Sequence, residues 1–324
     1  MSAIACVRIH TSQFPENVRR DLRESLRTRR VNHKFHYDSV KQTQKWLALH
    51  QAYSPTRNDA DCQAIYDRGF EAAAARMKAK AVHVIGLGCG GGQKDTRLLK
   101  LLKAGGRKVF YTPCDVSSAM TLVARQAALS ALPEKNCFPF VCDLATADDL
   151  PDVLATRHSS VVTFFGMIPN FEPQLILPKL ASLIRKKDCL LFSANLAPGK
   201  DYAAGVKKVL PQYDNPLTRD WLKTFLLDLG IEHNDGKLLF EIGNDPAGSG
   251  LKRIVACFHF TRSLRIETDG EVFSFRPGNM IQLFFSYRYT PALVSRTLGR
   301  HGLEVCDQWI TRSEEEGVFL CRKK

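Results

Sequence analysis

One glycine-rich stretch constrains the fold of this chain more than any other part of the sequence. Residues 81–97 are AVHVIGLGCGGGQKDTR, in which a short apolar run leads into glycines at five of seven positions and then into a helical pattern near Lys94. Such a loop adopts backbone conformations that a Cβ atom forbids, and it lets a ligand approach the main chain. The literal GxGxxG match is Gly86, Gly88 and Gly91. The stretch predicts a strand, a cofactor loop and a helix, with a plain strand-to-helix connection as the alternative.

Acidic residues end the next two predicted strands. A strand over residues 108–112 leads to Asp115, and a strand over residues 138–142 leads to Asp143. The carboxyl ends of parallel strands meet at one edge of an open α/β sheet, which is where such sheets bind ligands. An acid at the second strand end suits ribose hydroxyls, although Asp115 together with Ser117 could instead cap the following helix. The three strand ends therefore predict a single ligand crevice.

The order of patterns along the chain predicts an α/β protein with a second lobe. Strand and helix patterns alternate through residues 60–195 as in βαβ units, which indicates a parallel sheet covered on both faces. From about residue 197, strand-like segments with hairpin spacing predict antiparallel pairing. A last helix and two final strands would then return to the parallel sheet. The expected parallel strands lie near residues 82–86, 108–112, 138–142, 161–165 and 189–194.

Composition and charge limit the cellular compartments and the classes of partner that fit this chain. The 324-residue chain has a formal net charge of +13, which leaves a nucleic-acid partner open. Arg27, Arg29 and Arg30 equally fit the solvated side of an amphipathic helix over residues 15–30. The sequence shows no signal-peptide pattern and no apolar run long enough for a membrane span. Ten cysteines without CxxC spacing indicate neither a zinc site nor a disulfide framework, so we expect a cytoplasmic protein.

Several further motifs together resemble one enzyme family. The glycine loop with KDTR, then CDVS, VCDL and FFGMIPNFEP at residues 164–173, is similar to the S-adenosylmethionine-dependent amino-acid Nα-methyltransferases typified by the histidine trimethylase of ergothioneine biosynthesis. HKFHYD, YSPTRND, YDNP, KRIVACF and FFSYRYTP also have counterparts there, so the likeness covers nearly the whole chain. It implies a class I Rossmann-like methyltransferase sheet over residues 61–196 plus 287–324. A second α+β lobe for substrate recognition would comprise residues 1–60 plus 197–286.

On the cofactor side, the resemblance implies contacts from the glycine loop and from both acidic strand ends. Lys94 would contact the methionine part of S-adenosylmethionine, although a lysine at a helix start could equally be solvated. Asp115 would bind the ribose and Asp143 the adenine amino group. The implied cofactor-binding residues are Gly86, Gly88, Lys94, Asp115, Asp143 and Leu144.

On the substrate side, the resemblance implies that Tyr53, Asn170 and Tyr213 hold the amine and carboxylate of an amino acid. An asparagine side chain offers both a carbonyl acceptor and an amide donor, which suits these two groups. Asn170 could instead form an Asx turn before Pro173, and Tyr53 could simply pack in the core. These alternatives stay open at the level of sequence.

The predicted side-chain pocket departs from the family pattern. Histidine-methylating members have a Glu-x-Ser pair where this chain has Phe284 and Ser286, and a methionine where it has Ala256. A carboxylate that accepts an imidazole proton contributes about 1.5 to 3 kcal/mol, so we expect histidine to bind poorly. An apolar or aromatic substrate side chain would fit Ala256 and Phe284 better. The alternative is that Phe284 only packs in its strand and the pocket has moved.

The sequence therefore predicts a methyltransferase acting on the α-amine of an amino acid or amino-acid-like small molecule other than histidine. Histidine Nα-methylation is the first alternative, and methylation of RNA or protein by a basic enzyme is the second. A regulatory protein that binds the cofactor without catalysis is a third possibility. An NAD enzyme would explain the glycine loop but not the NFEP motif. The oligomeric state is not predicted.

Overall fold

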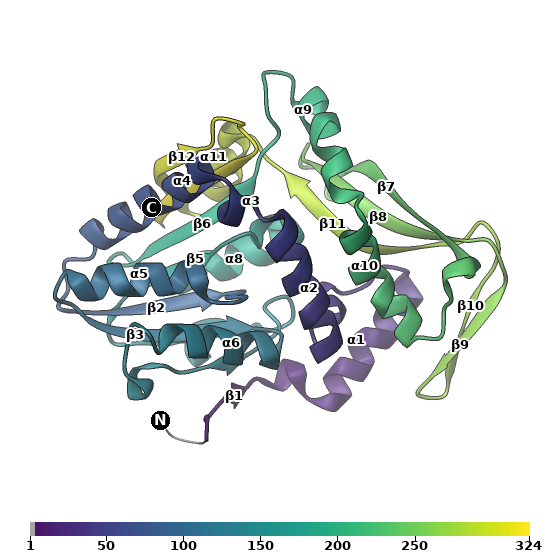
Figure 1. Ribbon diagram of the computed structural model, residues 1–324, viewed down its shortest axis with the longest axis horizontal. Helices are drawn as coiled ribbons and strands as arrows, with labels where there is room; N and C mark the ends of the chain where they lie inside the picture. Colours follow the sequence, from purple (N-terminus) through teal and green to yellow (C-terminus); the bar gives the residue numbers. More distant parts are fainter. Residues whose placement is uncertain (1–3) are drawn as a thin grey trace.

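A computed structural model describes residues 4–324, and a mixed sheet of eight strands forms its centre (Figure 1). Neighbouring strands are parallel except at the last two positions, where β13 pairs antiparallel with β6 and with β12. This order confirms the class I Rossmann-like sheet expected from the sequence, including its antiparallel close. Across the sheet the strands are β1 (Arg8–Ile9), β4 (Phe140–Val141), β3 (Lys108–Asp115), β2 (Ala81–Leu87), β5 (Ser159–Phe164), β6 (Cys189–Asn195), β13 (Glu316–Lys323) and β12 (Leu303–Ile310).

Helices cover both faces of this sheet because its strands are apolar on both sides. Successive side chains of a strand point to opposite faces, so Val84 packs with α4 (Ala60–Arg76) and α5 (Gln93–Ala104), and also shares a core with the end of α6 (Ser118–Ala128). Ile85 packs on the other face with α7 (Leu150–Val153), α8 (Pro173–Leu183) and α11 (Pro291–Gly299). The sheet is therefore buried between two helical layers, as parallel sheets are.

A second lobe lies beside the carboxyl ends of the parallel strands (Figure 1). Its sheet is antiparallel, and a separate hairpin extends from it. Leu26, Trp221, Phe258 and Phe284 belong to its own hydrophobic core. Its elements are α1 (Pro15–Thr28), α2 (Val40–Tyr53), α3 (Pro55–Asn58), α9 (Tyr202–Val209), α10 (Pro216–Asp228), β7 (Gly236–Asn244), β8 (Lys252–Phe260), β9 (Leu264–Thr268), β10 (Glu271–Phe275) and β11 (Met280–Arg288).

The N-terminal segment differs from the sequence-based expectation at its first strand, and it also contains a helix that the sequence does not predict. Arg8 and Ile9 pair with β4 and so extend the central sheet, although residues 1–60 were assigned to the second lobe. The aromatic-rich stretch after residue 33 lacks helical periodicity, yet most of it forms α2, whose N-cap is Ser39. Contacts to α10 and α6 stabilise this helix. The division of the chain into two domains otherwise stays a prediction.

The arginines of α1 are paired within the protein. Arg27 forms ion pairs with Glu24 and, across to β10, with Glu271, which also receives Arg23. Arg30 pairs with Glu172. These pairs join α1 and the segment just after it to neighbouring elements, so Arg23, Arg27 and Arg30 each already have an acidic partner within the protein. In the part of the chain that the structure describes, no helix has the length and apolar character needed to cross a bilayer.

Candidate active site

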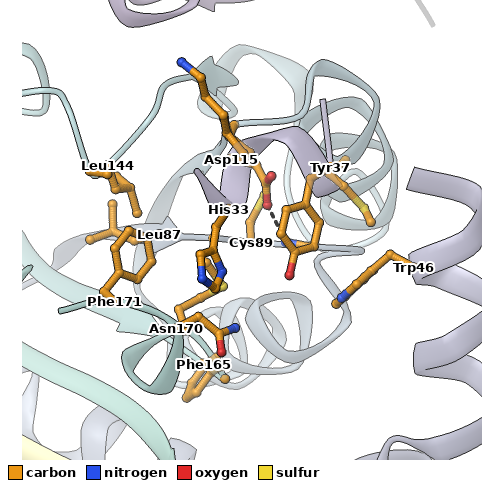
Figure 2. A pocket seen from close by; sticks show the side chains of 18 of the residues that line it. His33, Tyr37, Trp46, Leu87, Cys89, Asp115, Leu144, Phe165, Asn170 and Phe171 are labelled. Atoms are coloured by element: carbon orange, nitrogen blue, oxygen red, sulfur yellow. Dashed lines mark hydrogen bonds between the residues drawn. The ribbon is translucent and has the colours of Figure 1, made fainter. Parts of the chain in front are cut away.

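A cavity of about 790 Å³ lies between the carboxyl edge of the central sheet and the second lobe. This volume is within the range of about 300 to 1,000 Å³ that small-molecule sites occupy. Figure 2 shows its walls: Leu87, Cys89 and Asp115 come from strand ends of the sheet, while His33 and Trp46 come from the N-terminal segment. The three strand ends expected to form one crevice therefore do line one cavity.

Glycine is required in the loop after β2 for reasons the structure makes explicit. Gly92 has a φ of 73°, and a Cβ there would lie 2.7 Å from the Cα of Ala124 in α6. Gly86 lies outside the cavity lining, and a Cβ on it would collide with the carboxylate of Asp95. Gly88 does line the cavity, with a φ of 59°. Gly86 therefore leaves room for the Asp95 carboxylate under the glycine loop, while Gly88 lines the cavity with its main chain.

Asp115 lines the cavity and accepts two hydrogen bonds from the backbone around it. Its Oδ2 accepts a hydrogen bond from the Gly90 amide at 3.1 Å, and its Oδ1 accepts one from the Ser117 amide at 3.0 Å. The side chain of Ser117 caps α6. Burial raises the pKa of Asp115 to about 6, against the opposing effect of these backbone N–H donors. Asp115 thus ties the glycine loop to the second strand end while lining the cavity.

Asp143 retains an unused acceptor. Its Oδ1 accepts from the Ala145 amide at 2.8 Å, but its Oδ2 is buried and has no hydrogen-bond partner among the described residues. The ammonium of Lys34, itself bonded to Asp21 at 2.5 Å, lies 3.6 Å from that oxygen. A buried carboxylate oxygen without a donor is costly, and a ligand amino group would satisfy it. Leu144, the next residue, lines the same part of the cavity.

Lys94 belongs to a polar cluster that the sequence does not reveal. Its ammonium donates to the Tyr66 hydroxyl at 2.9 Å and lies 4.3 Å from the centre of that ring. The Tyr66 hydroxyl also bonds Ser193, at 2.8 Å, and Glu316. Burial lowers the pKa of Lys94, and the Glu316 carboxylate opposes that shift. Lys94 is therefore held at the cavity wall rather than solvated, by partners far from it in sequence.

Asn170 lies where the sequence places it. It closes a short 3-10 helix, η4 (Ile168–Asn170), directly after β5, and its backbone N–H donates to the Met167 carbonyl at 2.9 Å. Its side chain lines the cavity and makes no hydrogen bond to any residue within 4–324. The Asx turn considered from sequence would need such a bond. The amide of Asn170 is therefore available to a ligand.

The loop that carries Asn170 is anchored to the second lobe through Glu172. This carboxylate accepts hydrogen bonds from Arg30 and Arg253, each at 3.0 Å, and from the Tyr287 hydroxyl. The three donors come from the N-terminal segment, β8 and β11. Sequence reasoning noted the NFEP motif but not this use of its glutamate, because the partners are distant along the chain.

The structure does not bring the other two predicted substrate-binding tyrosines to the cavity. Tyr53, at the end of α2, is 52% exposed and does not line it. The hydroxyl of Tyr213 donates to Ser286 Oγ at 2.9 Å and accepts from Arg288 at 2.8 Å. Tyr213 and Ser286 thus pair with each other within the second lobe, outside the cavity lining. Their roles stay predictions.

The predicted side-chain pocket is filled by its own residues. Phe284 is 7% exposed and packs against Trp221 and His33, with ring centroids 5.8 and 5.3 Å apart. Ala256 lies opposite it on β8 and is fully buried. Alternation along β11 turns Phe285 the other way, and this ring lines the cavity instead. Phe284 thus packs in its strand, and the place of a substrate side chain stays a prediction.

Sequence comparison decides the family. A family model described as histidine-specific methyltransferase, SAM-dependent, matches residues 15–227. The chain belongs to this family. It is an S-adenosylmethionine-dependent methyltransferase. A search of curated proteins finds no matching relative.

Two of the solved structures with a similar course of the chain are described as methyltransferases. The magnesium protoporphyrin IX methyltransferase ChlM from Synechocystis PCC 6803, with bound SAH, is 14% identical, with 88% of this chain and 95% of that chain covered and a TM-score of 0.48. The methyltransferase CcbJ from Streptomyces caelestis is 16% identical, with 79% and 95% covered and a TM-score of 0.40. Both likenesses are too weak to bear on the substrate.

The residues of the cavity fit the cofactor of this methyltransferase. S-adenosylmethionine supplies an electrophilic methyl group on a sulfonium when it is bound. Asp143 Oδ2 is paired with the Lys34 ammonium but accepts no hydrogen bond from the described residues, which suits an adenine amino group, and Asp115 lies beside main chain that a ribose could approach. Lys94 at the other end of the glycine loop suits a carboxylate. The methyltransferase would hold its cofactor with these groups.

Proposed function

We propose that this methyltransferase acts on the α-amine of an amino acid or amino-acid-like small molecule other than histidine. The observation that carries the proposal is the free amide of Asn170, which lines the cavity on the loop that follows β5. Its carbonyl can accept an amine N–H, and its NH2 group can donate to a carboxylate. One side chain thus suits the two polar groups that all α-amino acids share.

Methyl transfer to an amine is a direct displacement, so the protein contributes mainly by alignment and electrostatics. Asn170 would orient the amine, and the anchoring of Glu172 by two arginines and a tyrosine would keep the Asn170 loop in place. Met167, Phe171 and Phe285 supply apolar wall near this point. An apolar or aromatic substrate side chain fits that wall.

The arrangement of carboxylates supports a substrate other than histidine. Within the described residues, the acids that line the cavity are Asp95, Asp115, Asp143 and Glu172. Asp95 accepts from Tyr111 and Thr163 beneath the glycine loop. Glu172 is engaged by its own three donors. An imidazole N–H on the substrate side would therefore lack a free carboxylate, which costs about 1 to 3 kcal/mol for a buried donor.

The test is methylation of single L-amino acids by purified protein, with release of S-adenosylhomocysteine as the rate and mass spectrometry to locate the methyl group. We expect an apolar or aromatic amino acid to gain a methyl group on its α-amine, faster than histidine does. Asn170→Ala should lower kcat/KM about 10- to 100-fold while affinity for S-adenosylhomocysteine is kept. Asn234→Ala, at an exposed position of the second lobe, is the matched control.

Two results would contradict the proposal. Histidine as the fastest acceptor would show that the imidazole finds a partner which the four cavity carboxylates do not provide. Methylation of RNA or protein, with no amino acid accepted, would instead favour the reading suggested by the net charge of +13. In that second case no amino acid would be methylated, so Asn170→Ala could not lower the kcat/KM for one.

A further inference from the structure

His33 is a cavity residue to which neither the predicted site nor the proposed function assigns a role. It opens the 3-10 helix η2 (His33–His36), between α1 and α2, and lines the cavity. Its ring lies edge-on to Phe285, with centroids 4.7 Å apart, and tilted on Phe284 at 5.3 Å. Figure 2 shows the imidazole directed toward the side chain of Asn170. His33 and Asn170 thus approach the same region of the cavity from different lobes.

Both ring nitrogens of His33 are unsatisfied. They are shielded from solvent, and neither has a hydrogen-bond partner within residues 4–324. The neighbouring His36 differs, because its Nε2 bonds to the Leu283 carbonyl at 2.7 Å. Buried polar atoms in proteins are nearly always paired, and an exception calls for an explanation such as a bound ligand. His36 therefore has a structural partner, while His33 still lacks one.

The imidazole of His33 is neutral in this setting. Burial lowers its pKa to about 3, and the nearby His36 and Arg253 add to that shift. A neutral imidazole carries one N–H donor and one unprotonated acceptor nitrogen. An uncharged ring also avoids repulsion with the sulfonium of the cofactor. His33 can therefore accept a hydrogen bond in a place where a cation would be unfavourable.

We propose that His33 is a substrate-contacting residue whose unprotonated ring nitrogen accepts a hydrogen bond from the attacking amine, opposite the carbonyl of Asn170. This inference rests on the proposed function. A primary amine that aims its lone pair at the methyl carbon has two N–H bonds left, and the two side chains supply two acceptors. To accept this hydrogen bond, the ring has to rotate toward the open part of the cavity. The rotation would give a partner to a ring nitrogen that otherwise has none.

The reaction balances without any further reagent. The amine lone pair forms the new N–C bond, the C–S bond breaks with its electron pair moving to sulfur, and the surplus proton of the methylated amine passes to water. Because each added methyl group replaces one N–H, a secondary amine can use only one of the two acceptors. His33 should therefore matter more for the first methyl transfer than for a second one.

The experiment compares His33→Phe and His33→Asn with wild type, using S-adenosylmethionine and each common L-amino acid as probes. For the acceptor that wild type uses best, we expect His33→Phe to lower kcat/KM about 10- to 100-fold. His33→Asn, which keeps an acceptor, should recover part of that loss. Affinity for S-adenosylhomocysteine, measured by calorimetry, should be unchanged in both variants. His233→Phe, at an exposed position of the second lobe, is the control.

A second readout does not depend on turnover. In wild type labelled with 15N-histidine, addition of S-adenosylhomocysteine and then of the best acceptor should shift the NMR signal of the unprotonated ring nitrogen of His33.

In the kinetic data, the rate of the first methyl transfer divided by the rate of the second should fall in His33→Phe. A merely structural role would lower both transfers alike and would leave that nitrogen signal unmoved.

The possible failures are distinguishable. If wild type methylates an amino acid and His33→Phe does so equally well, the role of His33 is wrong while the proposed function stands. Loss of S-adenosylhomocysteine affinity in His33→Phe would likewise overturn it, because the ring would then support the fold of the cavity. If wild type methylates no amino acid, the proposed function fails, and this inference fails with it.

Discussion

The two halves of the cavity differ in how they are built. The cofactor half consists of neighbouring strand ends of one sheet, with Gly88 just after β2, Asp115 at the end of β3 and Asp143 just after β4. The substrate half combines η2, the loop after β5 and one face of β11, which are far apart in sequence. The first half is defined mainly by backbone geometry, and the second by which side chains meet across two lobes.

This difference would allow a chain of this fold to keep its cofactor site while its substrate side changes. In the cofactor half, a substitution such as one at Gly92 meets the backbone of α6, which cannot move aside. In the substrate half, Phe284 and Phe285 are neighbours on one strand, yet only Phe285 lines the cavity. A change of Phe285 would therefore alter the cavity wall, whereas a change of Phe284 would act on the core of the second lobe.

Among the variants that test this comparison, Phe284→Glu in the substrate half should have the largest effect, which is a loss of folding stability. Phe284 is 7% exposed among aromatic rings, so an unpaired carboxylate should lower the free energy of unfolding by about 3 to 5 kcal/mol. Phe284→Leu, which stays apolar, should cost only about 1 kcal/mol. Urea denaturation measures both. A stable Phe284→Glu protein with faster histidine methylation would show that position 284 does reach the substrate.

In the cofactor half, Asp115→Ala should weaken binding of S-adenosylmethionine about 100-fold. The expected loss is that of a charge-assisted hydrogen bond, about 1.5 to 3 kcal/mol, together with a loosened Gly90 amide. Ser117→Ala is the matched control, because it removes the cap of α6 and should lower stability by about 1 kcal/mol with little effect on affinity. Calorimetry with purified protein separates the two. Unchanged affinity in Asp115→Ala would place the ribose elsewhere.

Lowering the pH should change the contributions of His33 and Asp115, one from each half, to folding stability in opposite directions. The pKa of His33 is lowered in the folded state, so its contribution to stability is lost as the pH falls below the unfolded value of about 6.5. His33→Phe should therefore reduce the stability lost between about pH 7 and pH 5 by up to about 2 kcal/mol. Thermal unfolding over this range measures the effect.

The pKa of Asp115 is raised to about 6, so the folded state takes up its proton first and gains stability as the pH falls. Asp115→Asn should therefore steepen the loss of stability on acidification by about 1 kcal/mol over the same interval. Equal slopes in wild type and both variants would show that neither group is as strongly desolvated as its position in the cavity indicates.

The smallest effect is expected for Tyr53→Phe. The ring is 52% exposed and lies outside the cavity lining, so kcat/KM should stay within about twofold of wild type. Steady-state kinetics with the best amino-acid acceptor tests this. A loss of tenfold or more would mean that the end of α2 closes over the bound substrate, and the role assigned to Tyr53 from sequence would then be right.

Much of the cofactor half could be predicted from the sequence because its determinants are local. A β-branched run, a glycine cluster and an acid at a strand end each lie within about ten residues, and parallel connections bring consecutive strand ends together. Asp115, Asp143, Leu144 and Asn170 accordingly line the cavity as expected. The helix α2 was missed because its residues lack a clear apolar period, and contacts with α10 and α6 hold it.

The rest was decided by tertiary structure. Which of Phe284 and Phe285 faces the cavity depends on how β11 pairs with β8, with a register shift between Gln282 and Phe284. The donors to Glu172 lie at least 81 residues away along the chain, and Lys94 bonds Tyr66, 28 residues away. The ring nitrogens of His33 have no hydrogen-bond partner within residues 4–324. Sequence alone determined that this chain forms a methyltransferase sheet with a cofactor crevice, because strand ends and loops are local properties. The tertiary structure decided which side chains line the cavity beside that crevice, because that depends on the packing of one lobe against the other.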